Sequence, residues 1–310
     1  MSDGWTPERA RRLDQLAGPD GIVVGTAVDH RDSLRIALEK KGLDAPTAAE
    51  LSALKLRIVR ALAPASTLVL LDAETSAAQA LAEGALPGSV ALGVPLEAQG
   101  YGDVADVPRT DFLPGWSPAQ AARLGAAACK LLLPYRADVP EQADAQDEVV
   151  REAVGACRSA SVALVLEPIV YGSPEPERFE SLVVEGAARL AGLGPDLLKL
   201  QHPGSPAGCR ALDRACGPQV PWVLLGGGAS PDVLAGQVAD ACAAGASGFV
   251  VGRTLWDNAL LADERDSQRA LEQESLPLLA RLAAVARASG RPWRDRVGPI
   301  PSPEPGTLPA

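Results

Sequence analysis

The sequence lacks long apolar runs and any cluster of basic residues. No uninterrupted apolar stretch in the 310 residues approaches the roughly 18 residues that a membrane-spanning helix needs. Acidic residues (39) outnumber basic ones (29), and the net charge of -10 would repel a phosphate backbone. We therefore expect neither a membrane nor a nucleic acid as partner. With 47% hydrophobic and 22% charged residues the composition excludes wholesale disorder, so we expect a soluble globular protein.

Cysteine and histidine are also sparse. The five cysteines are odd in number and have no Cys-x-x-Cys spacing, and the first twenty residues lack the apolar core of a signal peptide, so a cytoplasmic protein is expected. The two histidines, His30 and His202, are too few for a three-histidine zinc site; Asp or Glu could substitute as ligands, but we expect no catalytic metal. We expect no coenzyme, because the glycine run at 226–228 lies too late in the chain for a dinucleotide fingerprint.

Lysine is scarce as well. It supplies only five of the 29 basic residues, the other 24 being arginine. Lys40, Lys41 and Lys55 lie in helical patterns, where we expect them to be exposed. Lys130 and Lys199 instead interrupt the apolar runs ACKLLLPY and DLLKLQ, where a charge is costly to bury. These two lysines therefore need an explanation.

Apolar runs bounded by turn residues predict eight strands, and amphipathic helical patterns alternate with them. The predicted strands span residues 21–29, 66–72, 89–95, 128–135, 161–168, 196–201, 221–226 and 247–252. Eight such units favour a closed TIM (β/α)8 barrel, with an open doubly wound sheet as the alternative. Alternation along the fourth strand directs Cys129 toward the helices and Lys130 toward the barrel interior.

The remaining segments are additions to this barrel domain, which we expect to span residues 1–297. Residues 5–17 predict a helix that caps the bottom of the barrel, and 254–290 predict a long helical region. Residues 298–310 form a Pro-rich tail with too little apolar content to fold. The long connection at 97–116 follows the third strand, and we expect it at the catalytic face as a lid or an interface arm.

Polar residues gather at the carboxyl ends of the predicted strands, where barrels of this kind place catalysis. They are Asp29, His30, Arg31, Lys130, Glu167, Lys199 and Gln201. A lysine in a dry interior beside a second ammonium has its charged form disfavoured, and a free amine attacks carbonyls to form a Schiff base. Glu167 is placed to move the proton that bond cleavage requires, with Asp29 as second choice. The alternative is a purely structural network in which lysines and carboxylates neutralise each other.

The last two strands predict a phosphate site. The seventh is followed by Gly226, Gly227 and Gly228 and a Ser-Pro helix start, and the eighth by Gly252 and Arg253. Free backbone N–H groups at a helix N-terminus, with an arginine beside them, bind phosphate, and barrels commonly place such a site after these strands.

Seven stretches, in family order, resemble the class I aldolases of the tagatose 1,6-bisphosphate aldolase type, which include aldolases for sulfofructose 1-phosphate. They are AVDHR, PLEAQGY, GAAACKLLLPYRAD, LVLEPIVY, DLLKLQHPG, VPWVLLGGGAS and AGASGFVVGRTLW. The resemblance implies a lyase that splits a phosphorylated ketose, like one of these two substrates, into dihydroxyacetone phosphate and an aldehyde. It also implies the roles of individual residues: Lys199 as the Schiff-base lysine, Glu167 as acid and base, Lys130 and Asp29 as neighbours that tune the amine and bind the sugar, and Gly227, Gly228, Gly252 and Arg253 around a phosphate. The choice of Lys199 over Lys130 depends on the resemblance.

Three features depart from the family pattern. His30 stands where glutamine is usual, Gly226 stands where a serine often contributes a hydroxyl, and HPGSPAGC after the sixth strand is unfamiliar. These positions, with Arg31 and Gln201, are expected to contact the substrate rather than the amine. Two other functions stay open: a sugar-phosphate-binding regulator without lyase activity, and an isomerase that uses Glu167 as a base. Association into a homo-oligomer is also expected.

Overall fold

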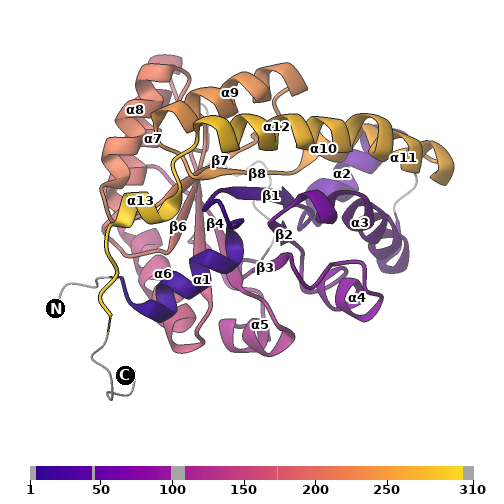
Figure 1. Ribbon diagram of the computed structural model, residues 1–310, viewed down its shortest axis with the longest axis horizontal. Helices are drawn as coiled ribbons and strands as arrows, with labels where there is room; N and C mark the ends of the chain where they lie inside the picture. Colours follow the sequence, from indigo (N-terminus) through magenta and orange to yellow (C-terminus); the bar gives the residue numbers. More distant parts are fainter. Residues whose placement is uncertain (1–4, 44–45, 99–108, 173, 303–310) are drawn as a thin grey trace.

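The computed structural model describes residues 5–43, 46–98, 109–172 and 174–302, and its strands form a closed barrel of eight parallel strands (Figure 1). The strands are β1 (Val23–Ala27), β2 (Leu68–Leu70), β3 (Ala91–Pro95), β4 (Ala128–Pro134), β5 (Ala163–Ile169), β6 (Leu197–Leu200), β7 (Trp222–Leu225) and β8 (Gly248–Val251). Closure is explicit in the register, because β1 pairs with β2 through Gly25 and Leu68 and with β8 through Val24 and Phe249. The predicted TIM barrel is confirmed, and the open sheet is excluded.

Helices surround the strands on all sides in Figure 1. They are α1 (Pro7–Leu16), α2 (Asp32–Lys40), α3 (Ala48–Leu62), α4 (Ala77–Ala82), α5 (Pro118–Leu124), α6 (Pro140–Ser159), α7 (Pro176–Ala191), α8 (Pro206–Cys216), α9 (Pro231–Ala244), α10 (Arg253–Trp256), α11 (Glu264–Ala270), α12 (Leu276–Ser289) and α13 (Trp293–Val297). Helices α5, α8 and α9 begin at a Ser-Pro pair, and the pair before α9 is the helix start predicted after the seventh strand. Proline fits the first helical turn, and the Ser117 and Ser205 hydroxyls each accept a hydrogen bond from a free backbone N–H of that turn.

Strand side chains divide between two apolar cores. The inner core fills the lower part of the barrel with small and branched side chains: Val23, Ala27, Leu68, Leu70, Ala128, Ala163, Val165, Leu197, Val223 and Val250. The alternate residues pack against the helices in the larger outer core. Cys129 belongs to the outer core, as its alternation with Lys130 predicted.

The two ends of the described chain close the bottom of the barrel together. Helix α1 inserts Leu13 and Leu16 into the inner core, and the rings of Trp5 and Trp293 lie 5.2 Å apart between their centroids. Arg9 fastens α1 to the start of β6, its Nε donating to Asp196 Oδ1 at 2.6 Å. The predicted capping helix is thus confirmed, and α13 shares its role. Water is excluded from this end of the barrel.

The other additions are partly described. The helical region after β8 is confirmed as α10, α11 and α12, with a π-helical turn at Leu271–Ser275. Residues 298–302 of the predicted tail form neither helix nor strand, and 303–310 lie outside the described residues, as do 99–108 of the long connection after β3. The two ends of that connection meet in an antiparallel bridge between Glu97 and Phe112.

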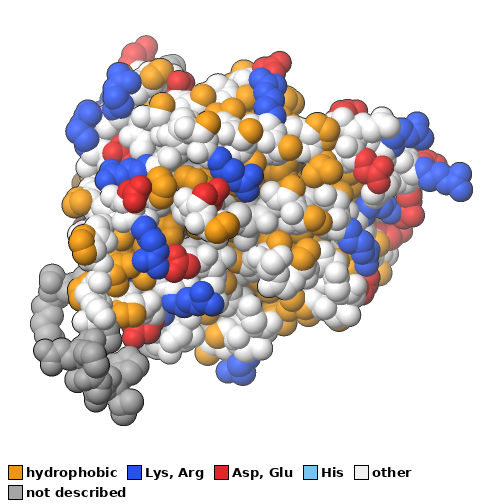
Figure 2. Space-filling model, in the orientation of Figure 1, with side chains coloured by type: hydrophobic (Ala, Val, Ile, Leu, Met, Phe, Trp, Pro, Cys, Tyr) orange, Lys and Arg blue, Asp and Glu red, His pale blue; other side chains and the backbone are white. Residues whose placement is uncertain are grey.

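The charged side chains on the surface are distributed as expected from a sequence without a cluster of basic residues. On the face shown in Figure 2, basic and acidic side chains are interspersed and form no continuous basic area. Among the helices of the described chain, none combines the length and the apolar character needed to cross a bilayer.

A substitution in α1 tests how much the closed bottom of the barrel contributes to stability. Leu13→Ala deletes a fully buried side chain of the inner core, so we expect it to lower the free energy of unfolding by about 2 to 5 kcal/mol. Leu81→Ala, at a half-exposed leucine of α4, is the control and should cost less than about 1 kcal/mol. Urea unfolding followed by circular dichroism measures both, and equal losses would contradict the role of α1.

Candidate active site

Four predicted residues meet inside the upper end of the barrel. Alternation along the strands directs Asp29, Lys130, Glu167 and Lys199 inward, above the inner apolar core, and each is at most 6% exposed. Leu166 of β5 pairs with Leu198 of β6, so Glu167 and Lys199 are the next residues on the two strands. Lys199 Nζ lies 2.9 Å from Glu167 Oε1. The two groups are within hydrogen-bonding distance, as the chemistry inferred from the sequence requires.

Lys130 is surrounded by carboxylates. Its Nζ lies 3.0 Å from Asp29 Oδ2, 2.5 Å from Glu97 Oε1 and 3.6 Å from Glu167 Oε2. Burial opposes the charge, but the carboxylates of Asp29, Glu97 and Glu167 outweigh it and raise the pKa of Lys130 above its ordinary value. Lys130 therefore stays a cation at every physiological pH.

Glu167 links the two lysines. Its Oε1 contacts Lys199, whereas its Oε2 is buried, faces Lys130 at 3.6 Å and has no hydrogen-bond partner among the described residues. A buried carboxylate oxygen without a partner is costly unless something binds it. Glu167 Oε2 is thus placed to accept a hydrogen bond from a molecule inside the barrel.

The carboxylates on the other side of Lys130 differ from each other. Burial raises the pKa of Asp29, but the charges of Lys130, His30 and Lys199 outweigh burial, so the pKa falls below its usual range. For Glu97 burial has the larger effect: it raises the pKa of the carboxyl more than the charge of Lys130 lowers it, so the pKa lies above its usual range. Asp29 is therefore the permanent counter-ion, and Glu97 is the more easily protonated partner.

Glu97 is a site residue that the sequence analysis did not single out. It lies two residues beyond Pro95, the last residue of β3, and continues the inward alternation of that strand. Its Oε2 also accepts a hydrogen bond from the backbone N–H of Leu132 at 3.1 Å. This alternation was the available signal, but it was obscured because Glu97 opens the long connection after β3.

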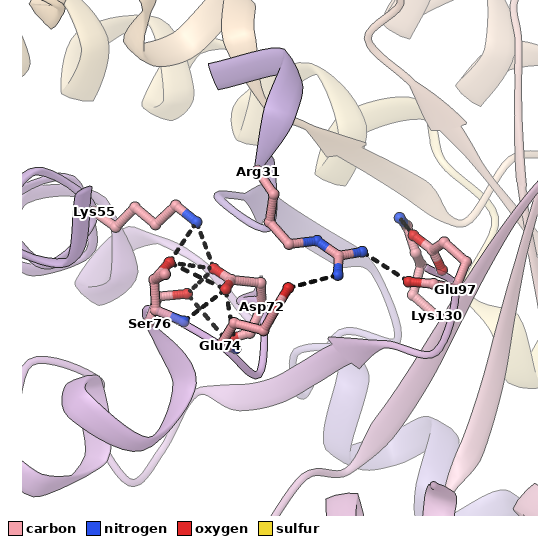
Figure 3. Close-up of polar contacts among 8 residues, drawn as sticks. Arg31, Lys55, Asp72, Glu74, Ser76, Glu97 and Lys130 are labelled. Atoms are coloured by element: carbon pink, nitrogen blue, oxygen red, sulfur yellow. Dashed lines mark hydrogen bonds and ion pairs between the residues drawn. The ribbon is translucent and has the colours of Figure 1, made fainter. Parts of the chain in front are cut away.

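The prediction that Lys55 is exposed is wrong. Its side chain is fully buried, and Nζ lies 2.5 Å from Asp72 Oδ2 at the end of β2 (Figure 3). Asp72 also accepts hydrogen bonds from the Thr75 N–H and the Ser76 hydroxyl. Lys55 follows Leu51 by four residues on the buried face of α3, so its helical position, rather than its charge, determined its placement.

Arg31 connects this second buried pair to the site. One guanidinium nitrogen donates to Glu74 Oε2 at 2.8 Å, and another donates to the backbone carbonyl of Glu97 at 2.7 Å. Figure 3 shows the resulting series of contacts from Lys55 through Asp72, Glu74 and Arg31 to Glu97 and Lys130. Arg31 is 7% exposed and so lies within the protein rather than at an open mouth.

The predicted phosphate site is formed by two strand ends. Gly227 and Gly228 have positive φ angles of 56° and 76°, which favour glycine, and they form the turn before α9. Arg253 lies against this turn: a Cβ placed on Gly228 would be 3.4 Å from its Nη2. Gly226 also suits its surroundings, because a Cβ there would lie 3.0 Å from Val251 Cγ1, closer than most real contacts. The packing of Val251 therefore leaves little room for a side chain at position 226.

Two hollows flank this triple-glycine turn. One, of about 680 Å³, is lined by Gln201, His202 and the three glycines; the other, of about 690 Å³, is lined by Gly228 and Arg253. The Gln201 carbonyl oxygen accepts from the Val170 N–H at 2.7 Å, and its NH2 group makes no hydrogen bond to another described residue. The structure thus opens the turn to solvent on both sides.

His30 lies between the carboxylate cluster and Arg253. Its Nδ1 is 3.8 Å from Asp29 Oδ1, its ring meets Trp256 edge-on, and a Cβ on Gly252 would be 2.7 Å from its Cε1. Burial lowers the pKa of His30 to about 4, against the attraction of Asp29 and with the help of Lys199 and Arg253. At neutral pH the imidazole is therefore uncharged.

Comparison with known proteins was made for sequence and structure. The model of the DeoC/LacD family of aldolases matches residues 24–258. The tagatose 1,6-diphosphate aldolase of Streptococcus pneumoniae (strain TIGR4) is 24% identical over 328 residues, covering 94% of this chain and 99% of that enzyme. The tagatose 1,6-diphosphate aldolase of Staphylococcus aureus (strain JH9) is 25% identical over 289 residues, covering 82% and 86% of the two chains.

Two solved structures share the fold. A fructose-bisphosphate aldolase from Slackia heliotrinireducens superposes with a TM-score of 0.65 at 17% identity, covering 91% of this chain and 90% of that one. An archaeal fructose 1,6-bisphosphate aldolase gives a TM-score of 0.62 at 18% identity, covering 90% and 99% of the two chains. Both likenesses show the barrel fold.

An NMR titration tests the lowered pKa of His30. The folded pKa of His30, about 4, lies below the ordinary value of 6.5, so the unfolded chain takes up a proton on this imidazole at a higher pH than the folded chain does. The free energy of unfolding therefore decreases as the pH falls from 6.5 to about 4. We expect the ring C–H resonance of His30 in an NMR titration to move with a midpoint near pH 4. The spectrum of His202→Asn identifies the signal, and a midpoint near 6.5 would contradict the burial described.

The Lys55–Asp72 pair gives a second test. Asp72→Asn leaves the ammonium of Lys55 buried without a counter-ion, and we expect a loss of about 3 to 5 kcal/mol in the free energy of unfolding. Adding Lys55→Met to that variant should restore part of the loss, since no unpaired charge remains. Glu83→Gln, in the exposed Arg60–Glu83 pair, is the control, expected to cost less than about 1 kcal/mol. A double variant no more stable than Asp72→Asn alone would refute this explanation.

Proposed function

The chain belongs to the DeoC/LacD family of aldolases, as its motifs predicted, and on this premise we propose that Lys199 forms the Schiff base through which it cleaves a phosphorylated ketose. Aldolases are carbon–carbon lyases, and this chain is an enzyme of that class. The products would be dihydroxyacetone phosphate and an aldehyde. The observation that supports this proposal best is the different surroundings of the two buried lysines.

An amine attacks a ketone only after it loses its proton, and nearby carboxylates hold that proton in place. Three carboxylates lie within 3.6 Å of Lys130 Nζ. Among the described residues Lys199 is ion-paired with Glu167 alone. Lys199 also has the positive charge of Lys130 on the far side of that shared carboxylate. Lys199 is therefore the nucleophile that the charges favour, a distinction that the sequence alone did not provide.

The proposed reaction uses Glu167 for proton transfer. The amine of Lys199 adds to the ketone carbon C2, and loss of water leaves a protonated imine. Glu167 then takes the proton of the C4 hydroxyl, the C3–C4 bond breaks, and its electron pair moves to the imine to give an enamine and the free aldehyde. Protonation at C3 and addition of water release dihydroxyacetone phosphate and regenerate the amine. The unpartnered Oε2 of Glu167 supports this role.

The other residues would bind and orient the substrate. Lys130, a permanent cation, would stabilise the negative charge that develops on the C4 oxygen, and Asp29 would hold Lys130 in place. The N–H groups of the triple-glycine turn and of Gly252, with Arg253, would bind the phosphate on C1. This local site is needed because a chain of net charge -10 repels anions at long range.

Three more predicted substrate residues receive distinct roles. The neutral imidazole of His30 and the free NH2 group of Gln201 would bind hydroxyl groups of the sugar. Arg31, whose terminal nitrogens contact Glu74 and Glu97, would act by positioning Glu97. Self-association and a cytoplasmic location stay predictions from the sequence.

Reductive trapping tests the nucleophile. Borohydride added with dihydroxyacetone phosphate should fix a three-carbon adduct on Lys199, located by peptide mass mapping. Lys199→Arg keeps a cation but cannot form the imine, so it should form no adduct and should lose about a thousandfold or more in kcat. Lys41→Arg, which changes a partly exposed lysine, is the control and should behave as wild type. An adduct on Lys130, or turnover that survives in Lys199→Arg, would contradict the proposal, and survival would favour a base-catalysed isomerase.

A further inference from the structure

The ammonium group of Lys130 divides its contacts unequally among three carboxylates. Its Nζ donates a hydrogen bond to Glu97 Oε1 at 2.5 Å and lies 3.0 Å from Asp29 Oδ2, whereas Glu167 Oε2 is 3.6 Å away. The last distance exceeds the ordinary range of an N–H···O hydrogen bond. An ammonium has three N–H donors, so Glu97 and Asp29 engage two of them and leave one for a substrate oxygen.

The position of Glu97 is fixed by contacts other than the one with Lys130. Its Oε2 accepts a hydrogen bond from the Leu132 N–H at 3.1 Å, and its carbonyl accepts one from Arg31 at 2.7 Å (Figure 3). Its backbone also forms the antiparallel bridge with Phe112, and the residue is 1% exposed. Glu97 is therefore a fixed acceptor toward which the longer and more flexible lysine side chain is directed.

The contact between Lys130 and Glu97 matters for Glu167. Glu167 Oε2 is buried and has no hydrogen-bond partner among the described residues, and it is the oxygen that the proposed reaction leaves free for the C4 hydroxyl. A movement of Lys130 Nζ by roughly 0.5 Å toward this oxygen would form a hydrogen bond. Because Glu167 Oε1 already faces Lys199 at 2.9 Å, both oxygens would then be paired with an ammonium. A carboxylate paired in this way is a weaker base, since each opposite charge favours its ionised form.

Charge compensation alone does not require Glu97. The cluster contains the three carboxylates of Asp29, Glu97 and Glu167 and the two ammonium groups of Lys130 and Lys199. Without the carboxylate of Glu97 the two signs would balance, and neither lysine would be left without a counter-ion. The third carboxylate therefore contributes something other than neutralisation.

We propose that Glu97 is a positioning residue that holds Lys130 away from Glu167, so that Glu167 Oε2 stays free to take the substrate proton. Glu97 acts through Lys130 and does not contact the reacting atoms. The same contact directs the remaining N–H of Lys130 to the C4 oxygen. This inference depends on the proposed aldolase function and adds a residue to its machinery.

Kinetics of Glu97→Gln test the proposal. Glutamine has nearly the same shape but one carbonyl oxygen in place of the two oxygens that Leu132 and Lys130 use. We expect kcat to fall by about tenfold or more and KM to change by less than about threefold, because the base is weakened while the phosphate site is untouched. The probe is whichever of tagatose 1,6-bisphosphate, fructose 1,6-bisphosphate and fructose 1-phosphate the wild type cleaves fastest, with coupled detection of dihydroxyacetone phosphate. Glu83→Gln, in the exposed pair with Arg60, is the control and should leave kcat unchanged.

The pH dependence of kcat distinguishes this role from a merely structural one. The ionised groups that face Glu167 are Lys130 from β4 and Lys199 from β6. Closer contact with Lys130 favours the carboxylate, so the acid limb of the Glu97→Gln profile should move to lower pH by about 0.5 unit or more. An unchanged kcat, or a lower kcat with the acid limb in its wild-type place, would overturn the proposal.

A crystal structure of Glu97→Gln gives a readout that needs no substrate. Lys130 Nζ should lie within about 3.2 Å of Glu167 Oε2, and a distance of 3.6 Å or more would contradict the proposal. Glu97→Asp keeps the charge but is shorter by one methylene group, so its kcat and this distance should lie between those of the wild type and Glu97→Gln. If Glu97→Gln does not fold, Glu97→Asp carries the test, and wild-type values of both quantities would overturn the role of Glu97.

Borohydride trapping separates failure of this inference from failure of the proposed function. Imine formation with dihydroxyacetone phosphate involves no C4 hydroxyl, so Glu97→Gln should still give the adduct on Lys199. An adduct together with wild-type kcat in Glu97→Gln would retain the aldolase and remove Glu97 from this role, and so would loss of the adduct in that variant alone. Absence of adduct and turnover in the wild type would reject the aldolase itself, and the role of Glu97 with it.

Discussion

Two ammonium groups buried within a few ångströms of one carboxylate are the constraint on which the upper half of the barrel depends. Each charge would be costly to bury alone, and the cluster persists because three carboxylates surround Lys130 while Glu167 serves both lysines. The unequal division of these carboxylates makes the two lysines chemically different. One becomes a fixed cation, and the other keeps a single proton acceptor at 2.9 Å. The apolar core below keeps water away from this end of the cluster, which strengthens every interaction within it.

The parts of the structure that follow from a strict period were predictable. Seven of the eight strands lie within the predicted ranges and β5 runs one residue beyond its range, to Ile169, because buried parallel strands are nearly continuous apolar runs bounded by turn residues. The period of two along β4 placed Cys129 outside and Lys130 inside. The scarcity of lysine made the two interruptions of apolar runs conspicuous. Residue type, strand period and the rule that catalysis lies at the carboxyl ends of strands were together sufficient to locate the cluster.

The residues that were missed or misplaced depend on contacts between segments far apart in the chain. Lys55 is buried because its position on α3 faces Asp72, a partner that the helical pattern alone does not reveal. Glu97 lies in the connection just beyond the last residue of β3, where the strand pattern no longer marks it, and reaches Lys130 because β3 and β4 are neighbours. The terminal nitrogens of Arg31 are taken by residues 43 and 66 positions away. Local sequence determined which elements form, whereas tertiary packing determined which charges are paired.

The closure of the barrel floor by helices from both ends of the described chain has a consequence for the completion of the barrel. Trp293 contacts Trp5, and β8 completes the ring of strands by pairing with β1. The first elements of the described chain therefore need the last ones to complete their packing. Without β8 the ring of strands lacks its last member, and without α13 the floor lacks part of its apolar cover. The enclosed cluster above therefore depends on segments from both ends of the described chain being present together.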